Sequence, residues 1–341
     1  MQETRSYPIV SIVIPCRNEQ NYIEKNINSI LNQNYEGEIE ILIVDGMSDD
    51  GTRDIVSSYQ DSGVILLDNP HQFTPHAMNI GIHEAKGKYF VILGGHSFLD
   101  ENFVRYNVEV LEQNEDIGCC GGQIKNVYEN EEGEIIAKAM ASKFGVGNAT
   151  FRVGGNAGFV DTVAFGMYRA KIHQEIEGFD EELVRNQDDE YNFKLSKAGY
   201  KIYFDPKIVS HYYVRGSYKK LYKQYYQYGY WKVYVNKKHN TVTSVRQLIP
   251  FFFVLSLIAG IVLSFVHYSF FYMLFLGVFS YSFLAFLFGF KKAEKLNDSF
   301  KIASVFPILH FSYGFGYLVG IFDFIVRKKK PSKRSKTLSR K

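Results

Sequence analysis

VSIVIP at Val10–Pro15 and IEILIV at Ile39–Val44 are short, mostly apolar runs, and they decide the fold. Such runs are typical of strands that are buried on both faces, as in parallel sheets. Val64–Leu67 and Tyr89–Leu93 continue the series. Strands that alternate with helices form right-handed βαβ units. About the first 210 residues are therefore predicted to form an α/β domain with a mostly parallel, doubly wound sheet.

Helix signals separate these runs. Asn18 is expected to cap a helix whose apolar positions continue to Leu31. Further helices are expected at Thr52–Tyr59, Thr74–Ala85 and Glu101–Gln113, where helical patterns follow turn residues. Ligands of such sheets bind at the carboxyl ends of the strands, so the residues that follow each strand are the candidates for a site.

The composition excludes several classes of protein. The chain has 341 residues, of which 46% are hydrophobic, too many for a disordered protein. Nine of its 39 lysines and arginines lie in Arg327–Lys341, so residues 1–326 carry 30 basic against 36 acidic groups. No nucleic acid is expected as a partner, because such proteins concentrate basic residues on the folded domain. Three cysteines without CxxC spacing predict neither a disulfide framework nor a cysteine zinc site. The polar start, Met1–Tyr7, has no signal-peptide pattern.

Two uncharged stretches predict a membrane hairpin. Ile249–Val266 and Tyr268–Phe290 are separated only by His267. As helix they would extend about 63 Å, against a hydrocarbon core about 30 Å thick. Basic residues flank both ends of the pair and are absent from the turn, which predicts that both ends face the cytoplasm. A helical hairpin buried in a soluble core is the alternative.

The flanking segments are expected at the membrane surface. Ser217–Asn240 contains seven tyrosines, the only tryptophan and six lysines, a composition that suits the lipid headgroup layer. Ile302–Val326 is apolar but contains Pro307 and Asp323, and we expect it to be re-entrant or interfacial. Arg327–Lys341 predicts a disordered basic tail on anionic lipid.

Two strand ends carry the first candidate residues. Asp45 directly follows the second strand, where a carboxylate can accept from a base N–H or a ribose hydroxyl. A cap of the next helix is the alternative. Gly94 and Gly95 follow the fourth strand and would let a phosphate approach the backbone. The glycine signatures of dinucleotide-binding folds and P-loops are absent from the sequence.

Four segments, in this order, resemble glycosyltransferase family 2, the inverting GT-A enzymes. They are PCRNE from Pro15, IEILIVDGMSDDGT from Ile39, AMNIGIHEAKGKYFVILGGH from Ala77, and GFDEELVRNQDDEYNFKLSKAGYKIYFDP from Gly178. The resemblance covers residues 8 to about 235. The run from Val160 to Glu190 and the later QYYQYGYWK most resemble membrane-associated glycosyltransferases of exopolysaccharide assembly, such as the succinoglycan-type enzymes.

The resemblance implies a nucleotide-sugar donor and roles for individual residues. Asp188 matches the catalytic base, which takes the proton of the acceptor hydroxyl during inversion. An acidic first helical turn stabilised by the helix dipole is the alternative. The other candidates are Pro15, Arg17, Glu19, Asp45, Gly94 and Gly95 for the nucleotide, Arg215 for the diphosphate, and Asp161, Arg185, Asn186 and Gln187 for the acceptor.

The sequence departs from the family at the metal site. The family's Asp-x-Asp, which binds a divalent metal and the donor diphosphate, is Gly94-Gly95-His96 in this chain. His96 and His211 are the candidate ligands, and imidazoles suit Mn²⁺ better than Mg²⁺. A histidine with a purely structural hydrogen bond is the alternative. The missing carboxylate also predicts a weaker dependence on metal.

Together these observations predict a multi-pass protein of the cytoplasmic membrane with its catalytic domain on the cytoplasmic side. It would move one sugar from a nucleotide donor, expected to be UDP-linked, to a lipid-linked saccharide in the synthesis of exopolysaccharide or another cell-surface glycan. Polyprenyl phosphate as the acceptor is one alternative, and a non-catalytic nucleotide-sugar-binding membrane protein is the other. The predicted boundaries are 1–216 for the GT-A domain, 217–246 for interfacial helices, 247–326 for the membrane region with its hairpin at 249–290, and 327–341 for the tail.

Overall fold

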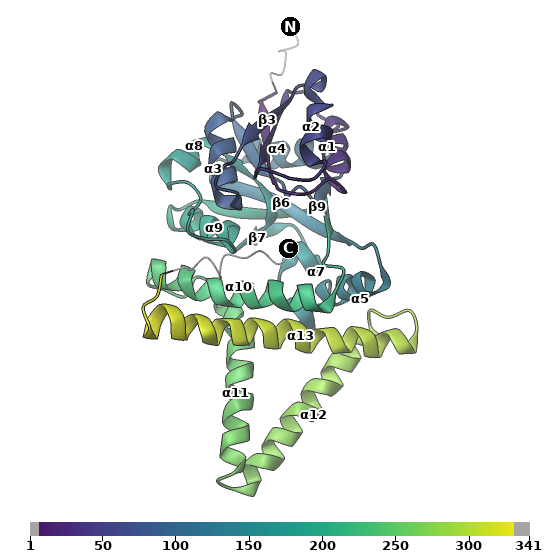
Figure 1. Ribbon diagram of the computed structural model, residues 1–341, viewed down its shortest axis with the longest axis vertical. Helices are drawn as coiled ribbons and strands as arrows, with labels where there is room; N and C mark the ends of the chain where they lie inside the picture. The colour runs from purple at the N-terminus through teal and green to yellow at the C-terminus, as the bar shows by residue number, and fades with distance from the viewer. Residues whose placement is uncertain (1–6, 331–341) are drawn as a thin grey trace. The chain divides into compact units, whose positions relative to one another are not determined.

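The computed structural model describes residues 7–330 (Figure 1). They divide into two compact units. Residues 7–125 and 154–213 form the first unit, and residues 126–153 and 214–330 form the second. Residues 126–153, which the sequence analysis assigned to the α/β domain, thus belong to the second unit. From position 331 onward the expected basic tail lies outside the described residues.

A mixed sheet runs through the first unit, and it confirms the predicted α/β fold. Its strands are β1 (Val10–Cys16), β2 (Ile39–Asp45), β3 (Val64–Asp68), β4 (Tyr89–Ile92), β5 (Ser97–Leu99), β6 (Ile117–Val127), β7 (Gly158–Val160), β8 (Ala164–Arg169) and β9 (Lys201–Tyr213). Their order is β3-β2-β1-β4-β8-β6-β9-β5, with β7 paired to β9. The first four strands pair in parallel, as the βαβ pattern predicts. β8 pairs antiparallel with β4 and β6, and β9 pairs antiparallel with β5 and β7.

Helices cover both faces of the parallel strands. On one face, apolar side chains of α1 (Ile23–Leu31), α2 (Thr52–Ser57) and α4 (Phe103–Gln113) join Ile12 and Ile14 of β1 in one buried cluster. On the other face lies α3 (Thr74–Glu84), where a Cβ on Gly81 would be 2.3 Å from Cγ1 of Val13. Successive side chains of a strand point to opposite faces. Burial on both faces therefore explains why the strand sequences are so uniformly apolar. The unit also contains a 3₁₀ turn (Gln60–Ser62), α8 (Ala170–Glu175) and α9 (Gln187–Lys197).

The second unit is helical. Its elements are α5 (Glu131–Met140), α6 (Lys143–Val146), α7 (Thr150–Val153), α10 (Tyr218–His239), a 3₁₀ turn (Val245–Leu248), α11 (Ile249–Ser264), α12 (Tyr268–Phe290), α13 (Leu296–Gly320) and a π-helical turn (Ile321–Val326). α10 and α13 lie side by side, and α11 and α12 leave them as a hairpin (Figure 1). A Cβ on Gly229 of α10 would lie only 2.0 Å from the carbonyl oxygen of Tyr313 in α13. Glycine is therefore what lets these two helices pack so closely.

Within residues 7–330, three helical segments are long and apolar enough to cross a membrane: Val245–Ser264, Tyr268–Phe290 and Leu296–Val326. The first two, joined at His267, correspond to the predicted hairpin. Only 6% and 11% of their most apolar windows are buried, against 44% for the third segment. The third segment differs because much of its apolar surface is already covered by protein.

The aromatic residues of α10 do not all face outward. Trp231 is fully buried, and its ring centroid lies 6.1 Å from that of Phe324 in the π-helical turn. Tyr230 and Tyr234 contact the same ring, with centroids 4.6 and 5.2 Å away. Trp231 therefore does not offer its ring to the surroundings of the second unit but joins α10 to the segment that follows α13.

Candidate active site

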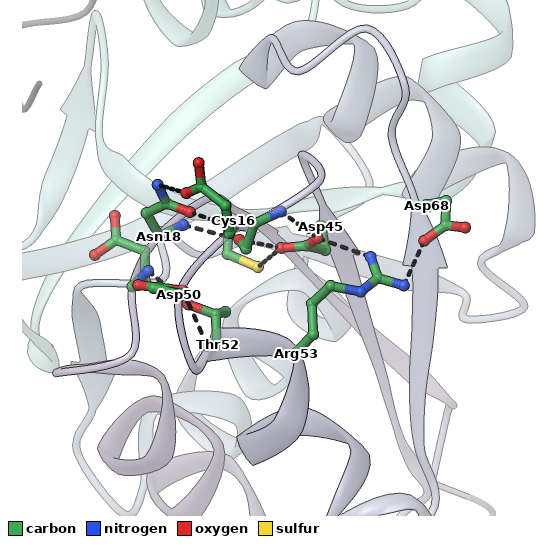
Figure 2. Close-up of polar contacts among 10 residues, drawn as sticks. Cys16, Asn18, Asp45, Asp50, Thr52, Arg53 and Asp68 are labelled. Atoms are coloured by element: carbon green, nitrogen blue, oxygen red, sulfur yellow. Dashed lines mark hydrogen bonds and ion pairs between the residues drawn. The ribbon is translucent and has the colours of Figure 1, made fainter.

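The loops after β1 and β2 are connected by hydrogen bonds. The backbone N–H of Asn18 donates to Oγ of Ser48 at 2.9 Å, and its side-chain amide donates to Asp49 at 2.6 Å (Figure 2). Asn18 has a left-handed backbone, with φ of 55°, which asparagine tolerates better than most residues. The predicted capping role of Asn18 is wrong, since α1 begins only at Ile23. Asn18 instead holds the ends of the first two strands together.

Asp45 is completely buried at the end of β2. Its Oδ2 accepts from the N–H of Ser48 at 2.9 Å and from Nη1 of Arg53 at 2.8 Å, and its Oδ1 accepts from the Ser48 hydroxyl at 2.5 Å (Figure 2). Arg53 also binds Asp68 at 2.8 Å, so the guanidinium bridges the ends of β2 and β3. Cys16 lies 3.7 Å from Oδ1 of Asp45. Burial, and then the charge of Asp45, raises the pKa of the Cys16 thiol, which therefore stays neutral.

This burial bears on the predicted role of Asp45. Because the residue is 0% exposed, a base or ribose reaches its carboxylate only if Ser48 or Arg53 moves. The side chain of Arg53 is 34% exposed and is fixed by Asp45. The sequence reasoning missed Arg53. The sequence does contain a signal for this residue, because Arg53 is the one basic side chain in a segment that also contains Asp49, Asp50 and Asp54.

The end of β4 lies beside the loop after β1. A Cβ on Gly95 would be 3.1 Å from Cβ of Cys16 and 3.2 Å from Cγ of Glu19, so little more than hydrogen fits there. Nδ1 of His96 lies 2.8 Å from Oε1 of Glu19. The structure thus brings together the predicted nucleotide residues of these two segments, namely Pro15, Arg17, Glu19, Gly94 and Gly95.

Two predicted site residues, Arg17 for the nucleotide and Arg215 for the diphosphate, contain buried guanidinium nitrogens. Nε of Arg17 has no hydrogen-bond partner among the residues that the structure describes, and a Cβ on Gly46 would lie 3.3 Å from its Cβ. Arg215 belongs to the second unit and is 5% exposed. Its Nε and Nη1 also lack partners within residues 7–330. Unpaired buried donors are costly, so each arginine favours an anionic ligand.

The structure does not bring His96 and His211 together. Phe98 of β5 lies opposite His211 of β9, and the two rings stack with centroids 4.3 Å apart. The ring of His96 instead contacts that of Tyr212, at 5.4 Å. Consecutive strand residues point to opposite faces, so the two imidazoles lie on opposite sides of β9. Burial, and then Lys125, lowers the pKa of His211.

A metal site is therefore not formed by these two histidines. Within residues 7–330 there is no group of three or more His, Cys, Asp or Glu that could hold a metal ion. His96 is paired with Glu19 as in the structural alternative, although this pair remains near the glycine-rich end of β4. The residues present do not fit the metal site that the fold family implies, and we derive no chemical step through a metal.

Asp188 is exposed in the first turn of α9, whose position β8 fixes. Asn192 donates to Oγ1 of Thr162 at 2.8 Å and accepts from the hydroxyl of Tyr168 at 2.9 Å. Asp188 lies one turn before Asn192 and therefore on the same helix face. Its charge contributes, after burial and Cys119, to the raised pKa of Tyr168. Because β8 is antiparallel to β4, it begins at the carboxyl end of β4, the sheet edge that also carries Asp45.

The predicted acceptor residues flank this helix. Asp161 is exposed and directly precedes Thr162, whereas Arg185 and Asn186 lead into α9. Asn186 has φ of 62°, a left-handed conformation that directs the chain into the helix. Gln187 is only 7% exposed, so it is largely covered. Arg185 and Asn186 therefore lie within three residues of Asp188 and are partly exposed, whereas Asp161 is exposed beside Thr162, which binds Asn192 of the same helix.

The sequence is similar to known glycosyltransferases. Residues 11–176 match the family model described as glycosyl transferase family 2. A dolichyl N-acetyl-alpha-D-glucosaminyl phosphate 3-beta-D-2,3-diacetamido-2,3-dideoxy-beta-D-glucuronosyltransferase of Methanococcus voltae is 35% identical, over 74% of this chain and 81% of that protein. The succinoglycan biosynthesis protein ExoA of Rhizobium meliloti is 29% identical, over 70% of this chain and 73% of that protein.

Solved structures share the fold. The first 349 residues of TarS from S. aureus, solved in complex with UDP, match with a TM-score of 0.51 and 16% identity, over 66% of this chain and 64% of that chain. The mannosyltransferase PcManGT of Pyrobaculum calidifontis, solved with GDP-Man and Mn²⁺, matches with a TM-score of 0.50 and 18% identity, over 65% and 62%. The chain spans just under two thirds of the length of these two structures. At this identity, the likeness shows the fold alone.

Proposed function

The chain belongs to glycosyltransferase family 2, and from this membership we propose that it is an inverting enzyme that transfers one sugar from a nucleotide-sugar to a lipid-linked saccharide. The observation that carries the proposal is Asp188, an exposed carboxylate on a helix that is tied to β8 at the sheet edge where β1, β2 and β4 end. Inversion needs the nucleotide on one side of the anomeric carbon and a base on the other. Both groups are available at this one edge.

In the proposed reaction, the acceptor hydroxyl oxygen attacks the anomeric carbon as the bond to the donor diphosphate breaks. The bonding electrons leave with the nucleoside diphosphate, and the hydroxyl proton passes to a carboxylate oxygen of Asp188. The buried Nε of Arg17 supports a role for this arginine in receiving the charge of the leaving group. The tight packing of Gly95 on Cys16 and Glu19 supports a fixed position of the end of β4 beside the loop after β1, where the nucleotide is proposed to bind.

The relatives support the substrate classes. We infer a UDP-linked donor, with which the UDP complex of TarS agrees. The relative from M. voltae is named for an acceptor in which a sugar phosphate is carried by dolichol, and the relative from R. meliloti for succinoglycan biosynthesis. A sugar carried on a lipid phosphate is therefore the proposed acceptor. A divalent metal, as in the complex of PcManGT, would here play a smaller part, since Gly94 and His96 replace the two carboxylates.

Membrane anchoring completes the proposal. Both ends of the α11–α12 hairpin are flanked by basic residues, which supports insertion from the cytoplasmic side. α13 lies along α10 while the hairpin leaves both (Figure 1). This arrangement supports an interfacial position for α13. If the hairpin spans the bilayer, α13, which lies beside α10, is left in the plane of the membrane.

Replacing Asp188 with Asn tests the catalytic assignment. We expect kcat to fall by about 10²–10⁴, with UDP affinity within about twofold of wild type, since the amide keeps the shape of the side chain. Asp189→Asn, which removes the neighbouring charge of the same helical turn, is the matched control and should keep most activity. Turnover that survives in D188N would refute the mechanism. Transfer to polyprenyl phosphate, but not to a lipid-linked saccharide, would favour the alternative acceptor.

A further inference from the structure

A pocket in the second unit is lined by three lysines. It has a volume of about 190 Å³, and its lining includes Lys143 of α6 and the two lysines that follow α12, Lys291 and Lys292. Phe288 forms an apolar wall, and Nζ of Lys291 lies 5.3 Å from the centroid of its ring. Ser142 also lines the pocket and is 2% exposed. Among the described residues, no carboxylate lines the pocket.

The three lysines are not neutralised by nearby acids. Within the part of the chain that the structure describes, none of them forms an ion pair. Glu294, two residues after Lys292, is instead bound by Lys138 at 3.2 Å. Ser142 accepts from the N–H of Phe144 at 3.3 Å, which leaves its hydroxyl hydrogen available to donate. Like charges that converge without a counterion favour an anionic ligand.

The location of the pocket selects the kind of anion. Lys291 and Lys292 follow the last residue of α12, in the short connection that leads to α13. If the hairpin spans the bilayer, as the proposed function holds, this helix end lies at the level of the lipid headgroups. A phosphate there is held by a lipid, and a small basic pocket at a membrane helix end suits such a headgroup.

We propose that this pocket binds the phosphate group of a membrane lipid. The lysines supply ammonium donors and Ser142 a hydroxyl donor to the phosphate oxygens, and Phe288 contacts the apolar part next to it. The inference adds a lipid site to the proposed enzyme and relies on the membrane placement of its hairpin.

The test uses the full chain in dodecyl maltoside, titrated calorimetrically with short-chain lipids. Dihexanoylphosphatidic acid and dihexanoylphosphatidylglycerol carry the phosphate with a net negative charge, dihexanoylphosphatidylcholine carries it in a zwitterionic headgroup with no net charge, and inorganic phosphate is the soluble comparison. The triple variant K143Q/K291Q/K292Q should weaken binding of the anionic lipids by about tenfold or more. The control K219Q/K220Q/K295Q removes the same charge elsewhere in the second unit and should stay within about twofold.

Equal losses in both triple variants, or unchanged binding in the pocket variant, would overturn the proposal. Inorganic phosphate that binds as tightly as the lipids would overturn the lipid assignment. K143Q alone, at an exposed residue, serves if the triple variant does not fold, and it should weaken binding in the same direction. Partition of the wild-type chain into phosphatidylcholine vesicles tests the membrane placement separately, so failure of the proposed function is distinguishable from failure of the pocket.

Discussion

Replacing Asp45 with Asn tests whether this buried carboxylate organises the loop after β2. The amide keeps one oxygen and the shape of the side chain, so the main loss is the charge that binds Arg53 at 2.8 Å. Removing one partner from a buried ion pair costs about 3–5 kcal/mol, but the Arg53 side chain is 34% exposed and water replaces part of the interaction. We therefore expect local stability to fall by about 2 kcal/mol, or roughly thirtyfold in the opening equilibrium.

Hydrogen exchange read by mass spectrometry on the full chain in detergent measures this opening. Peptides that cover residues 45–57 should exchange faster in D45N, whereas D54N, which removes an exposed acid within the same peptides, should change them little. In the double variant D45N/R53Q, the two losses should add only in part, because both substitutions break the Asp45–Arg53 contact and only R53Q also breaks the contact with Asp68. Additive losses would refute the reasoning, as would exchange in D45N that matches the wild type.

The same variants separate the two roles of Asp45 in nucleotide binding. If Asp45 acts only by fixing Arg53 and Ser48, then D45N and R53Q should weaken UDP binding by similar factors. If the carboxylate also contacts the nucleotide after a movement of Ser48, D45N should weaken binding further than R53Q. Isothermal titration of the full chain with UDP distinguishes these outcomes.

Three further predictions follow from other contacts. His211→Ala should leave turnover and its response to Mn²⁺ within about twofold of wild type, because His211 stacks on Phe98. His96→Ala should lower turnover, because it breaks the contact of His96 with Glu19. Equal effects of the two substitutions would show that the opposite orientation of the two rings is wrong. Burial, and then the charge of Lys194, lowers the pKa of His173 from 6.5 to about 4. As the pH drops from about 7 towards 4, the unfolded chain therefore protonates His173 at a higher pH than the folded chain does, and the free energy of unfolding falls. After allowance for screening by solvent, the loss of unfolding free energy is about 1–2 kcal/mol at pH 5. H173Q should therefore show a flatter pH dependence of its thermal unfolding, and an unchanged slope would count against His173 as the cause. Gly229→Ala should destabilise the second unit by about 1–3 kcal/mol, because its Cβ would meet the carbonyl oxygen of Tyr313, whereas Gly277→Ala points into open space and should be tolerated in the same thermal assay.

The parallel half of the sheet was predictable from the sequence because its signals are local. VSIVIP and IEILIV are buried on both faces, so every position is apolar except Ser11 and Glu40, which are hydrogen-bonded to each other. The antiparallel strands were not predicted. β8 pairs with β4 across a long stretch of chain, and Gly166 lies where a Cβ would meet Sγ of Cys119 at 2.5 Å. Contacts of this kind depend on distant residues and leave no periodic pattern.

The candidate site shows the same division. The residues at the ends of β1, β2 and β4 could be predicted, because the carboxyl edge of a parallel sheet is fixed by topology. Arg53, which holds Asp45, could not, since its partners come from two different strands. The proposed pairing of His96 with His211 failed for a related reason. The direction of each ring depends on the register of β5 on β9, which the sequence does not display.

The chain passes between the two units three times, near residues 125, 153 and 213. A single proteolytic cut after Tyr213 would therefore not be enough to yield a water-soluble catalytic fragment. Such a fragment would keep residues 126–153, whose Phe144 ring packs on Phe306 and whose Gly145 lies against Leu309 in the part that is cut away. Left without that covering, these side chains would make the fragment aggregate, so truncation for biochemical work has to remove or redesign the internal segment as well.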